Sequence, residues 1–390
     1  MPDTGMSFRL TPQQEEFQGT ARKFARDVLA DVAVQCERTG APVSAQVRRQ
    51  MGELGFLGIN IPEEYGGLGV GKIDSLIVLE ELAKISPAAA FPVFESNCGP
   101  TQTLLYAAPE WLKKKVLPQV CSGDYMVSVA MSEPDTGTAM TDLTTRAERK
   151  GDKLVINGTK RWCSGAGYSE GYVLYCRLED KPGGAGVGAV FFEKDTPGVS
   201  FGRPEKFMGV HGFHNAEIYL DNVEVPIENI IVPAGGVRDL MQTFNMERLG
   251  NAACSLGIAS SALDVALEYT QERTQFGKPL VDFQAVQLRL AEMKVDVDAM
   301  RLLIHRAAVE AGDGLPSMMD TSVAKCFANE AVRRVVANGM QVMGAVGYSS
   351  EYPMEQKVRD SWVWGIGGGH IDMQKTNIAS DLVGRRFSQR

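Results

Sequence analysis

An acid and a glycine-rich turn are the first features of this sequence that bear on chemistry. Glu247 stands beside Arg248 in the run NMERLG, inside a helical pattern. A carboxylate can act as a general base and remove a proton from carbon. Far downstream, the glycines at 367–369 lie among aromatic residues that could hold a planar ligand, but they carry no group that could move a proton. If the chain performs proton chemistry, Glu247 is its predicted base; the alternative is an ordinary solvated ion pair with Arg248.

Two further segments, residues 130–138 and 160–167, carry side chains suited to a flat, polar ring. An indole can stack on such a ring, hydroxyls can bond its polar edge, and glycine permits close approach. Taken alone, each segment is equally typical of an ordinary turn in a β domain. The side chains concerned are Met131, Ser132, Thr138, Trp162 and Ser164.

Three regions must position these residues. Residues 1–124 follow a helical pattern, in which Thr11 is a predicted N-cap and Pro12 a first helical residue. Further helices are predicted at 45–54 and 74–85, and the glycine-rich loop 62–69 separates helices rather than domains.

Residues 125–235 change to the pattern of short strands separated by glycine and proline. Asn157 and Gly158 are predicted to form a hairpin turn. We expect a small antiparallel sandwich or barrel. The predicted strands are residues 153–156, 172–176, 187–192 and 217–225.

Residues 236–390 return to apolar spacings of three and four, which predicts a helical bundle. The chain has 48 acidic and 40 basic residues, a net charge of -8, which disfavours nucleic acid and an anionic membrane surface as partners. The seven cysteines have no CxxC spacing, and no stretch is long and apolar enough for a membrane span. With an N-terminus that lacks the pattern of a secretion signal, the prediction is a cytoplasmic protein.

In order and spacing, these segments resemble the FAD-dependent acyl-CoA dehydrogenases over nearly the whole chain. No single motif is decisive, but all of them occur in the family's order. The motifs are residues 10–14 (LTPQQ), 62–69 (PEEYGGLG), 132–134 (SEP), 157–158 (NG) with Trp162, 272–277 (ERTQFG), 341–344 (QVMG), and 352–355 (YPME) leading to Arg359 and Asp360.

The resemblance implies an N-terminal helical domain, a middle antiparallel β domain and a C-terminal four-helix bundle, with FAD between the last two. It implies that Met131, Ser132, Trp162 and Ser164 line the flavin ring, with the Ser164 hydroxyl near N5, and that Thr138 also contacts the cofactor. A neighbouring subunit would hold the rest of the cofactor, so a homo-oligomer, a dimer or a homotetramer, is required. The residues implied for that contact are Arg273, Gln275, Phe276, Gln341 and Gly344.

The family's reaction, as the resemblance implies it, removes an α proton from an acyl-CoA thioester and passes a β hydride to flavin. Electron-transfer flavoprotein then accepts the electrons. Many members carry their glutamate at the position matching Gly368, but a minority resembling isovaleryl-CoA dehydrogenase carry it at the position matching Glu247. Arg248 matches a residue that helps to hold CoA. Burial beside an acyl chain would raise the pKa of Glu247, and Arg248 would oppose the rise.

The acyl group is less well specified. Gly367, Gly368 and Gly369 are predicted to leave room beside the flavin for a branched or cyclic acyl group, unless the flanking tryptophans refill it. Glu95 matches a segment that lines the acyl pocket, where it could contact a polar acyl group, act as a second acid or base, or be a hydrogen-bonded structural residue. His370 and Asp372 depart from the family pattern near the FAD phosphates. His211 and His214 form HxxH without a nearby acid, so no metal site is predicted.

Four other functions remain compatible with the fold. An acyl-CoA oxidase would make hydrogen peroxide, an enoyl-CoA reductase would run the same step backwards, and a non-catalytic flavoprotein would not respond to thioesters. A desulfinase of this fold is disfavoured, because it has glutamine at the position of Glu247 and arginine at the position of Phe91.

Overall fold

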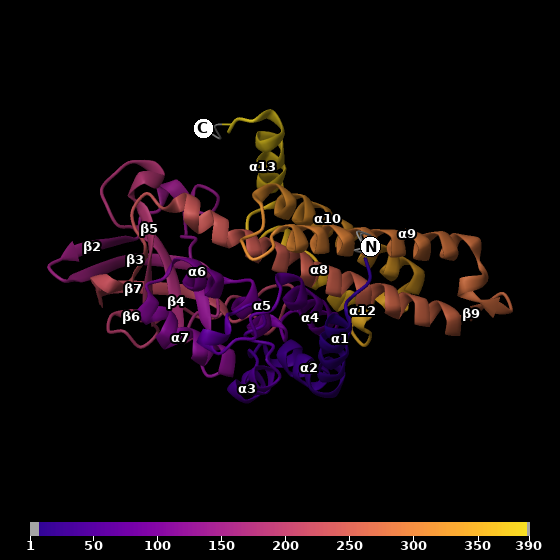
Figure 1. The fold of residues 1–390 in the computed structure, drawn as a ribbon. Coiled ribbons are helices and arrows are strands. Elements are labelled where there is room, and N and C mark those ends of the chain that lie inside the picture. Colours follow the sequence, from indigo (N-terminus) through magenta and orange to yellow (C-terminus); the bar gives the residue numbers. More distant parts are fainter. Residues whose placement is uncertain (1–7, 388–390) are drawn as a thin grey trace, which may run out of the picture.

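The computed structural model describes residues 8–387, in which helices, a sheet and helices again follow one another along the chain (Figure 1). α1 begins as predicted, because the Thr11 hydroxyl accepts a hydrogen bond from the Gln14 backbone N–H at 3.2 Å, and the Gln14 side chain accepts one from the Thr11 N–H at 3.0 Å. A π-helical turn (Ala25–Leu29) leads from α1 into α2. The N-terminal helices are α1 (Pro12–Phe24), α2 (Ala30–Thr39), α3 (Ala45–Glu53), α4 (Lys72–Ile85), α5 (Phe91–Asn97), α6 (Pro100–Ala107) and α7 (Glu110–Ser122).

The middle region is one mixed sheet with the strand order β6-β7-β3-β2-β4-β5-β8, and β1 pairs with β4. Most neighbours are antiparallel, as expected, but β1 and β2 each pair with β4 in parallel. The strands are β1 (Val127–Ala130), β2 (Arg146–Lys150), β3 (Lys153–Ser164), β4 (Gly171–Arg177), β5 (Val187–Glu193), β6 (Val199–Phe201), β7 (Asn215–Pro226) and β8 (Ile230–Val232).

The predicted hairpin turn at Asn157 and Gly158 is wrong. β3 continues through both residues, with a register shift against β7 between Ile156 and Gly158. A Cβ at position 158 would lie 2.5 Å from Thr145 Oγ1, so glycine is needed there for close approach of the backbone to a neighbouring residue. The turn instead lies before β3, where Gly151 has φ +68°.

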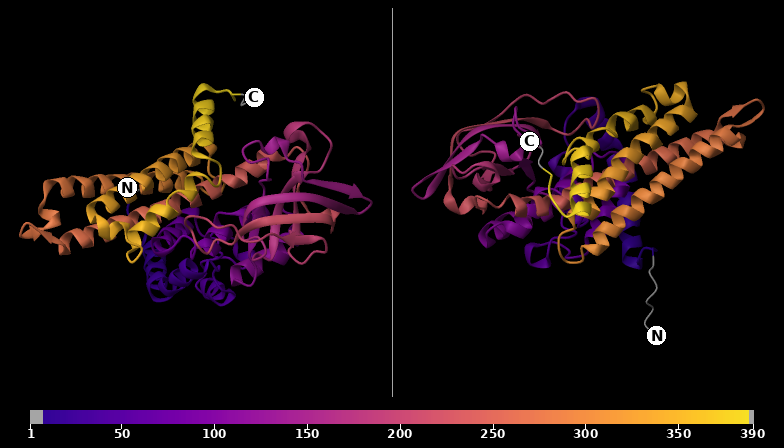
Figure 2. Two further views of the ribbon diagram at one scale, coloured as in Figure 1. Left: turned by 180° about the vertical axis from the view of Figure 1, so that it is seen from behind. Right: turned by 90° about the horizontal axis from the view of Figure 1, so that it is seen from above.

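The C-terminal region is built along α8, which runs from the sheet to a small hairpin at the opposite end of the molecule (Figures 1 and 2). α9 and α10 pack along α8, while α13 packs on α10 and projects from the body (Figure 1). These elements are α8 (Val237–Glu272), β9 (Thr274–Gln275), β10 (Lys278–Pro279), α9 (Gln284–Glu310), α10 (Met318–Met343), α11 (Ala345–Tyr348), α12 (Pro353–Asp360) and α13 (Ile371–Val383). Short 3₁₀ turns occupy Glu63–Tyr65, Met140–Asp142, Gly183–Gly186, Ile227–Asn229, Leu280–Asp282 and Val363–Gly365.

One hydrophobic core joins the N-terminal helices to the C-terminal bundle. α4 contributes Leu79 and Ala83 to it, and α8 contributes Leu256. The two helices approach closely at Gly257, where a Cβ would lie 2.6 Å from the Ala83 Cβ. Helices from the two ends of the chain are therefore held side by side, and this contact fixes where α8 passes the N-terminal region.

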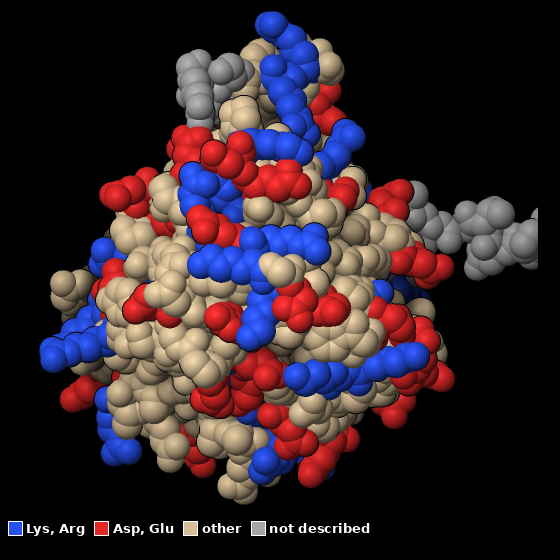
Figure 3. Space-filling model, turned by 90° about the vertical axis from the view of Figure 1, so that its left-hand side faces the viewer, with Lys and Arg blue, Asp and Glu red and all other residues tan. Residues whose placement is uncertain are grey.

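Charged side chains of both signs are mixed over the end of the molecule that the β sheet forms (Figure 3). No broad surface of a single sign covers this face, in keeping with a net charge of -8 spread over 88 charged residues, 48 acidic and 40 basic. Within residues 8–387, no helix combines the length and apolar character needed to cross a membrane.

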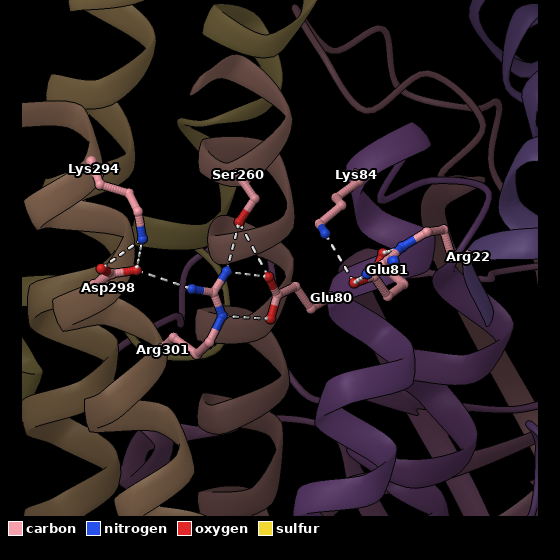
Figure 4. Close-up of polar contacts among 8 residues, drawn as sticks. All are labelled: Arg22, Glu80, Glu81, Lys84, Ser260, Lys294, Asp298 and Arg301. Carbon is pink, nitrogen blue, oxygen red and sulfur yellow. Dashed lines mark hydrogen bonds and ion pairs between the residues drawn. The ribbon is translucent and has the colours of Figure 1, made fainter. Parts of the chain in front are cut away.

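A buried ion pair also links the two helical regions (Figure 4). Arg301 on α9 donates to Glu80 on α4 at 2.6 Å, and the Ser260 hydroxyl on α8 donates to the same carboxylate at 3.2 Å. Glu80 has only 4% of its side chain exposed. Three helices from both ends of the chain thus meet at one carboxylate.

Candidate active site

Glu247 is brought to α5 by the packing of α8. A Cβ at Gly250, one turn further along α8, would lie 2.6 Å from the Cys98 Cβ and 2.8 Å from the Phe94 ring. Only glycine lets the two helices come this close. Glu95 on α5 is buried, and its pKa is raised well above the usual glutamate range by burial and then by the charge of Glu247. The predicted base and the predicted acyl-pocket acid therefore act on each other across one helix contact.

The environment of Glu247 suits a base that works near neutral pH. Burial raises the pKa of Glu247, while the cations Lys325 on α10 and Arg248 on α8 oppose the rise. Tyr175 on β4 is also near enough for Glu247 to raise its pKa. Residues of α5, α10 and β4, together with Arg248 on its own helix, thus face this carboxylate. A raised pKa makes it a stronger proton acceptor than an exposed glutamate.

Arg248 is buried beside the predicted base rather than exposed to solvent. Its guanidinium donates to the Asn245 side-chain oxygen and lies 5.8 Å from the centre of the Phe244 ring. Its Nε has no hydrogen-bond partner within residues 8–387. This guanidinium thus retains an unused donor, which suits the predicted contact with a polar or anionic part of a ligand.

The two predicted ring-binding segments lie side by side. The Arg161 backbone N–H donates to the Ser132 carbonyl at 3.0 Å. Lys160 is fully buried, and its Nζ donates to the Met131 carbonyl and to Glu133 Oε1, both at 2.8 Å. The sequence motif SEP therefore owes its shape to a buried ion pair with the next motif.

Glu133 is the centre of this arrangement. Its carboxylate accepts hydrogen bonds from the Thr144 hydroxyl at 2.6 Å and from the backbone N–H groups of Thr144 and Thr145 at 2.7 and 2.9 Å. Burial alone would raise the pKa of Glu133, but Lys160 and these donors lower it to about 2. The carboxylate is therefore ionised throughout the neutral range and holds the loop closed.

Trp162 is held in a strained conformation. Its φ is +61°, which is rare for a residue with a bulky side chain, and 49% of its surface is exposed. The Arg161 guanidinium lies 4.3 Å from the indole centre. Strain of this kind persists where the surroundings impose it, and it is concentrated at ligand-binding sites.

Asn215 bonds this segment from the neighbouring strand, and the sequence alone did not single it out. Its side-chain N–H groups donate to the Trp162 carbonyl at 3.2 Å and to the Ser164 hydroxyl at 3.1 Å. Its Oδ1 is buried and has no partner within residues 8–387. Asn215 lies on β7, opposite Ser164 in the strand register, so only the sheet pairing reveals its role.

Ser128 on β1 connects these segments with the acids. A Cβ at Gly165, whose φ is +77°, would lie 2.3 Å from the Ser128 hydroxyl oxygen. The same hydroxyl lies 2.8 Å from the Ser169 hydroxyl oxygen, and it is near enough to Glu95 to oppose the rise of that residue's pKa. The residues predicted to hold a flat ring and those predicted to contact an acyl group therefore converge.

Other predicted cofactor residues lie elsewhere. Arg273, Gln275 and Phe276 are exposed at the hairpin that follows α8 (Figure 2). The 25 residues of helix between Glu247 and Glu272 span about 38 Å at 1.5 Å per residue, so the hairpin cannot reach the site of its own chain. Phe276 has φ +51° and is 93% exposed.

Gln341 and Gly344 are exposed at the end of α10, and neither contacts the segments around Trp162 through a hydrogen bond within the described residues. Thr138 is also exposed, in the loop before β2.

The expectation of empty space at Gly368 is wrong. A Cβ there would lie 2.9 Å from both Lys325 Nζ and Asn251 Nδ2, so these two polar side chains occupy the space next to Gly368. At Gly369 the side chain of Gln374 would lie 2.6 Å away. Only Gly367 has open surroundings, with the Val363 carbonyl 3.6 Å from a Cβ.

The two tryptophans of this turn behave differently. Trp364 is buried, with its ring centre 5.9 Å from Phe94 and 5.7 Å from Phe213. Trp362 is 45% exposed, and the Arg333 guanidinium lies 4.0 Å from its ring. Trp364 therefore extends the apolar wall beside Glu95, while Trp362 faces outwards.

His370 and His211 have structural partners. His370 caps α13, because its Nδ1 accepts a hydrogen bond from the Asp372 N–H at 3.3 Å, and His211 lies 3.1 Å from Glu37. Within residues 8–387 no group of three His, Cys, Asp or Glu side chains could hold a metal ion.

Comparison with known proteins decides the family. Three domains described as the N-terminal, middle and C-terminal domains of acyl-CoA dehydrogenase match residues 11–124, 128–223 and 234–383. The chain belongs to the acyl-CoA dehydrogenase family. The predicted order of N-terminal helices, middle sheet and C-terminal helices is confirmed, and the chain is a flavoprotein oxidoreductase of this family, which uses FAD.

Two relatives are similar over their full length. Glutaryl-CoA dehydrogenase from Desulfococcus multivorans is 36% identical over 390 residues, covering 99% of this chain and 100% of that protein. The 3-sulfinopropanoyl-CoA desulfinase of Paraburkholderia xenovorans (strain LB400) is 34% identical over 388 residues, 98% and 99% of the two chains. A solved glutaryl-coenzyme A dehydrogenase in complex with glutaryl-CoA superposes with a TM-score of 0.94 at 35% identity, covering 99% and 98% of the two chains.

The residues present fit FAD in one respect that is independent of the family. Trp162, Ser164 and the unpartnered Asn215 Oδ1 combine an exposed indole, a hydroxyl and an unsatisfied buried acceptor on adjacent strands. A flat heterocycle with hydrogen-bonding edges matches this set.

Proposed function

We propose that this protein dehydrogenates an acyl-CoA thioester between its α and β carbons, with Glu247 as the base that removes the α proton. The supporting observation is the position of Glu247, a carboxylate with a raised pKa enclosed by α5, α8, α10 and β4. The glycine turn at 367–369, where the family resemblance implies that many members carry the acid, has none. FAD, when bound, accepts the hydride from the β carbon.

The other residues position the reactants. Trp162 and Ser164 hold the ring of FAD, with Met131, Ser132 and Thr138 beside it, and Arg248 supplies a buried donor for the CoA part. Removal of the α proton leaves Glu247 neutral, which its burial favours. The electrons then pass to an electron-transfer flavoprotein, as the family resemblance implies.

Replacing Glu247 with Gln tests the base. The variant keeps the size of the side chain and should keep bound flavin, but the rate of flavin bleaching by substrate under anaerobic conditions should fall by roughly 10²- to 10⁴-fold or more. Glu268, an exposed residue on the same helix, provides the control variant Glu268→Gln, whose rate should not change. Undiminished bleaching in Glu247→Gln would contradict the assignment.

We further propose that the acyl group is branched or cyclic and has no anionic end. The relatives named above act on glutaryl-CoA or 3-sulfinopropanoyl-CoA, whose acyl ends carry negative charge. Here the corresponding region presents Glu95 and the Phe91 ring, which lies 4.4 Å from Phe213. A second carboxylate beside Glu95 would be repelled if Glu95 were ionised, and it would lack a cation in either case. The open position at Gly367 leaves room for a branch.

A panel of thioesters tests this acyl class. Isovaleryl-, cyclohexanecarbonyl-, butyryl- and glutaryl-CoA are mixed anaerobically with the yellow protein, and kcat/KM is compared using an artificial electron acceptor. The branched or cyclic compounds should exceed butyryl-CoA, and glutaryl-CoA should be at least about 100-fold poorer, the discrimination expected when a charge is buried without a partner. A preference for glutaryl-CoA would reject the proposal.

We also propose that the active unit is a homo-oligomer, built from three-domain subunits with boundaries near 124 and 235. A stripe of apolar residues is exposed along α9, on the face opposite its buried residues, at intervals of seven. Helices that pack on one another show this spacing. The stripe consists of Leu288, Val295, Leu302 and Val309.

The hairpin after α8 provides a second, separate argument for a homo-oligomer. Arg273, Gln275 and Phe276 are exposed and lie too far from the ring-binding segments of their own chain. We propose that they complete the FAD site of a neighbouring subunit, together with Gln341 and Gly344. Sedimentation of the holoprotein should show a dimer or tetramer; a stable monomer that retains FAD would contradict this.

A further inference from the structure

Lys325 is a lysine buried in the middle of α10, and it is fully inaccessible to solvent. Its Nζ donates hydrogen bonds to the Gly367 carbonyl at 2.5 Å and to Asn251 Oδ1 at 3.3 Å. Both partners are neutral. An ammonium group removed from water is costly unless an opposite charge stabilises it, so this lysine needs a nearby anion.

Asn251 connects this lysine with the base. Its Nδ2 donates to the backbone carbonyl of Glu247 at 2.9 Å, one turn earlier on α8. Lys325, Asn251 and Glu247 therefore form a continuous link from α10 to α8, and the Gly367 carbonyl adds the glycine turn to it. The link holds three segments of the site at a fixed separation.

The glycine at 368 is part of the same arrangement. A Cβ at this position would lie 2.9 Å from both Lys325 Nζ and Asn251 Nδ2, so any side chain there would have to displace them. The φ of Gly368 is +64°, which also disfavours other residues. The position of Lys325 and the absence of a side chain at 368 are therefore coupled.

The charged and titratable groups that face Glu247 come from each element around it. Lys325 and Arg248 are the cations, Glu95 on α5 and Tyr175 on β4 can titrate, and Cys98 follows α5. Arg248 already bonds Asn245. That partner is neutral too, so Glu247 is the anion that acts on both cations. Burial lowers the pKa of Lys325, and the charge of Glu247 opposes the fall. Lys325 is also joined to the glycine turn, through the Gly367 carbonyl.

We propose that Lys325 is a positioning residue for the base: it fixes the glycine turn to α8 through Asn251 and supplies the positive charge that keeps Glu247 ionised before substrate is deprotonated. This inference depends on the proposed function only in naming Glu247 as the base. The link itself is a property of the folded chain.

The test compares Lys325→Met, which removes the charge, with Lys325→Arg, which keeps it, in FAD-loaded protein. Two measurements are made across pH 5–9: the anaerobic rate of flavin bleaching, and, without substrate, the infrared carbonyl band of protonated Glu247. That band is assigned by its loss in Glu247→Gln. Lys294→Met, at a half-exposed ion pair on α9, is the control.

In Lys325→Met the pH midpoint of both measurements should move upward by roughly one pH unit or more, since loss of an opposite charge favours the neutral acid. At a pH below both midpoints, the bleaching rate of Lys325→Met should be lower than that of the wild type, by about tenfold for each pH unit by which the midpoint has risen. Lys325→Arg, which keeps the charge, should have a pH midpoint equal or close to that of the wild type. A rate that falls equally at every pH, with an unmoved infrared midpoint, would overturn the proposal and leave Lys325 a merely structural residue.

Two further outcomes separate this inference from the proposed function. If Glu247→Gln still bleaches normally, the base assignment fails, but the infrared midpoint still reports whether Lys325 acts on Glu247. If Lys325→Met does not fold, Lys325→Gln replaces it as the neutral variant.

Discussion

Glu95 lies on α5 with 4% of its surface exposed, and the carboxylate of Glu247 faces it from α8. Burial raises the pKa of Glu95, and the charge of Glu247 raises it further. No cation is among the groups that shift the pKa of Glu95, whereas Glu247 has Lys325 and Arg248. The two acids therefore differ in their protonation, with Glu95 holding its proton at a pH where Glu247 has lost it.

This difference predicts a pH-dependent effect of Glu95→Gln on stability. An acid with a raised pKa in the folded state stabilises the protein below its unfolded pKa, and this contribution is lost as the pH rises through the folded pKa. Glutamine does not titrate. The Tm of the variant minus the Tm of the wild type should therefore rise by about 1 to 3 °C as the pH is raised from 5 to 9. Thermal unfolding of both proteins at matched concentration measures the difference.

The exposed Glu268 again supplies the control, because Glu268→Gln should change Tm by the same small amount at each pH. A Tm of Glu95→Gln that falls relative to wild type, or keeps a constant offset from it, as the pH rises from 5 to 9 would contradict the raised pKa of Glu95.

The sequence was a better guide to candidate catalytic and ligand-binding residues than to the residues that hold those side chains in place. Glu247 could be proposed because its motif resembles that of known enzymes. Lys325, Asn251 and Asn215 could not, because each acts through a contact with another element that no local pattern encodes. The space beside Gly368 was predicted wrongly, because its surroundings depend on Lys325, which belongs to a different helix.

Among the elements, the segment that joins β1 to β2 depends on one buried ion pair. Replacing Lys160 with Met leaves the Glu133 carboxylate buried without its cation, which should destabilise the protein by about 3–5 kcal/mol. The loop that holds Met131 and Ser132 should loosen, so less FAD should remain per polypeptide. Chemical unfolding and the ratio of flavin to protein absorbance measure the two effects.

The same ion pair predicts how the loop responds to acid. The pKa of Glu133 is lowered to about 2, so its contribution to stability is present above the unfolded pKa near 4.3 and is lost as the pH falls towards 2. Lys160→Met should lose less of its free energy of unfolding than the wild type does as the pH falls over this range. Lys153→Met is the control on the same strand, since both side chains of the Lys153–Glu224 pair are about half exposed, and its unfolding midpoint should not change.

Most elements could be predicted from periodicity, because helices and strands repeat their exposure at characteristic intervals. The error at Asn157 and Gly158 has a physical cause. The dipeptide favours a tight turn by its local conformational preferences, but here β7 and β2 pair with both sides of β3 and keep the strand extended. The parallel pairing of β1 and β2 with β4 was also beyond a local pattern, since it depends on how distant strands meet.

For the whole molecule, the N-terminal helices and the bundle behave as one body because they share a core and the Arg301–Glu80 pair (Figure 4). Arg301→Met removes the cation from a carboxylate whose side chain is 4% exposed, and should cost about 3–5 kcal/mol. Lys294→Met breaks a pair on the same helix whose side chains are 60% and 47% exposed, and should have no measurable effect. Thermal unfolding at equal concentration compares them; equal effects would contradict the role given to burial.

The hairpin beyond α8 has a consequence for how the protein behaves on dilution. If residues of one chain complete the flavin site of another, then separating the chains also weakens the hold on the flavin, and cofactor loss becomes a question of mass action. The yellow colour retained after dilution and filtration would then depend on how concentrated the protein was. A stock solution and an assay cuvette could contain different fractions of active enzyme, and added FAD would matter most in the more dilute one.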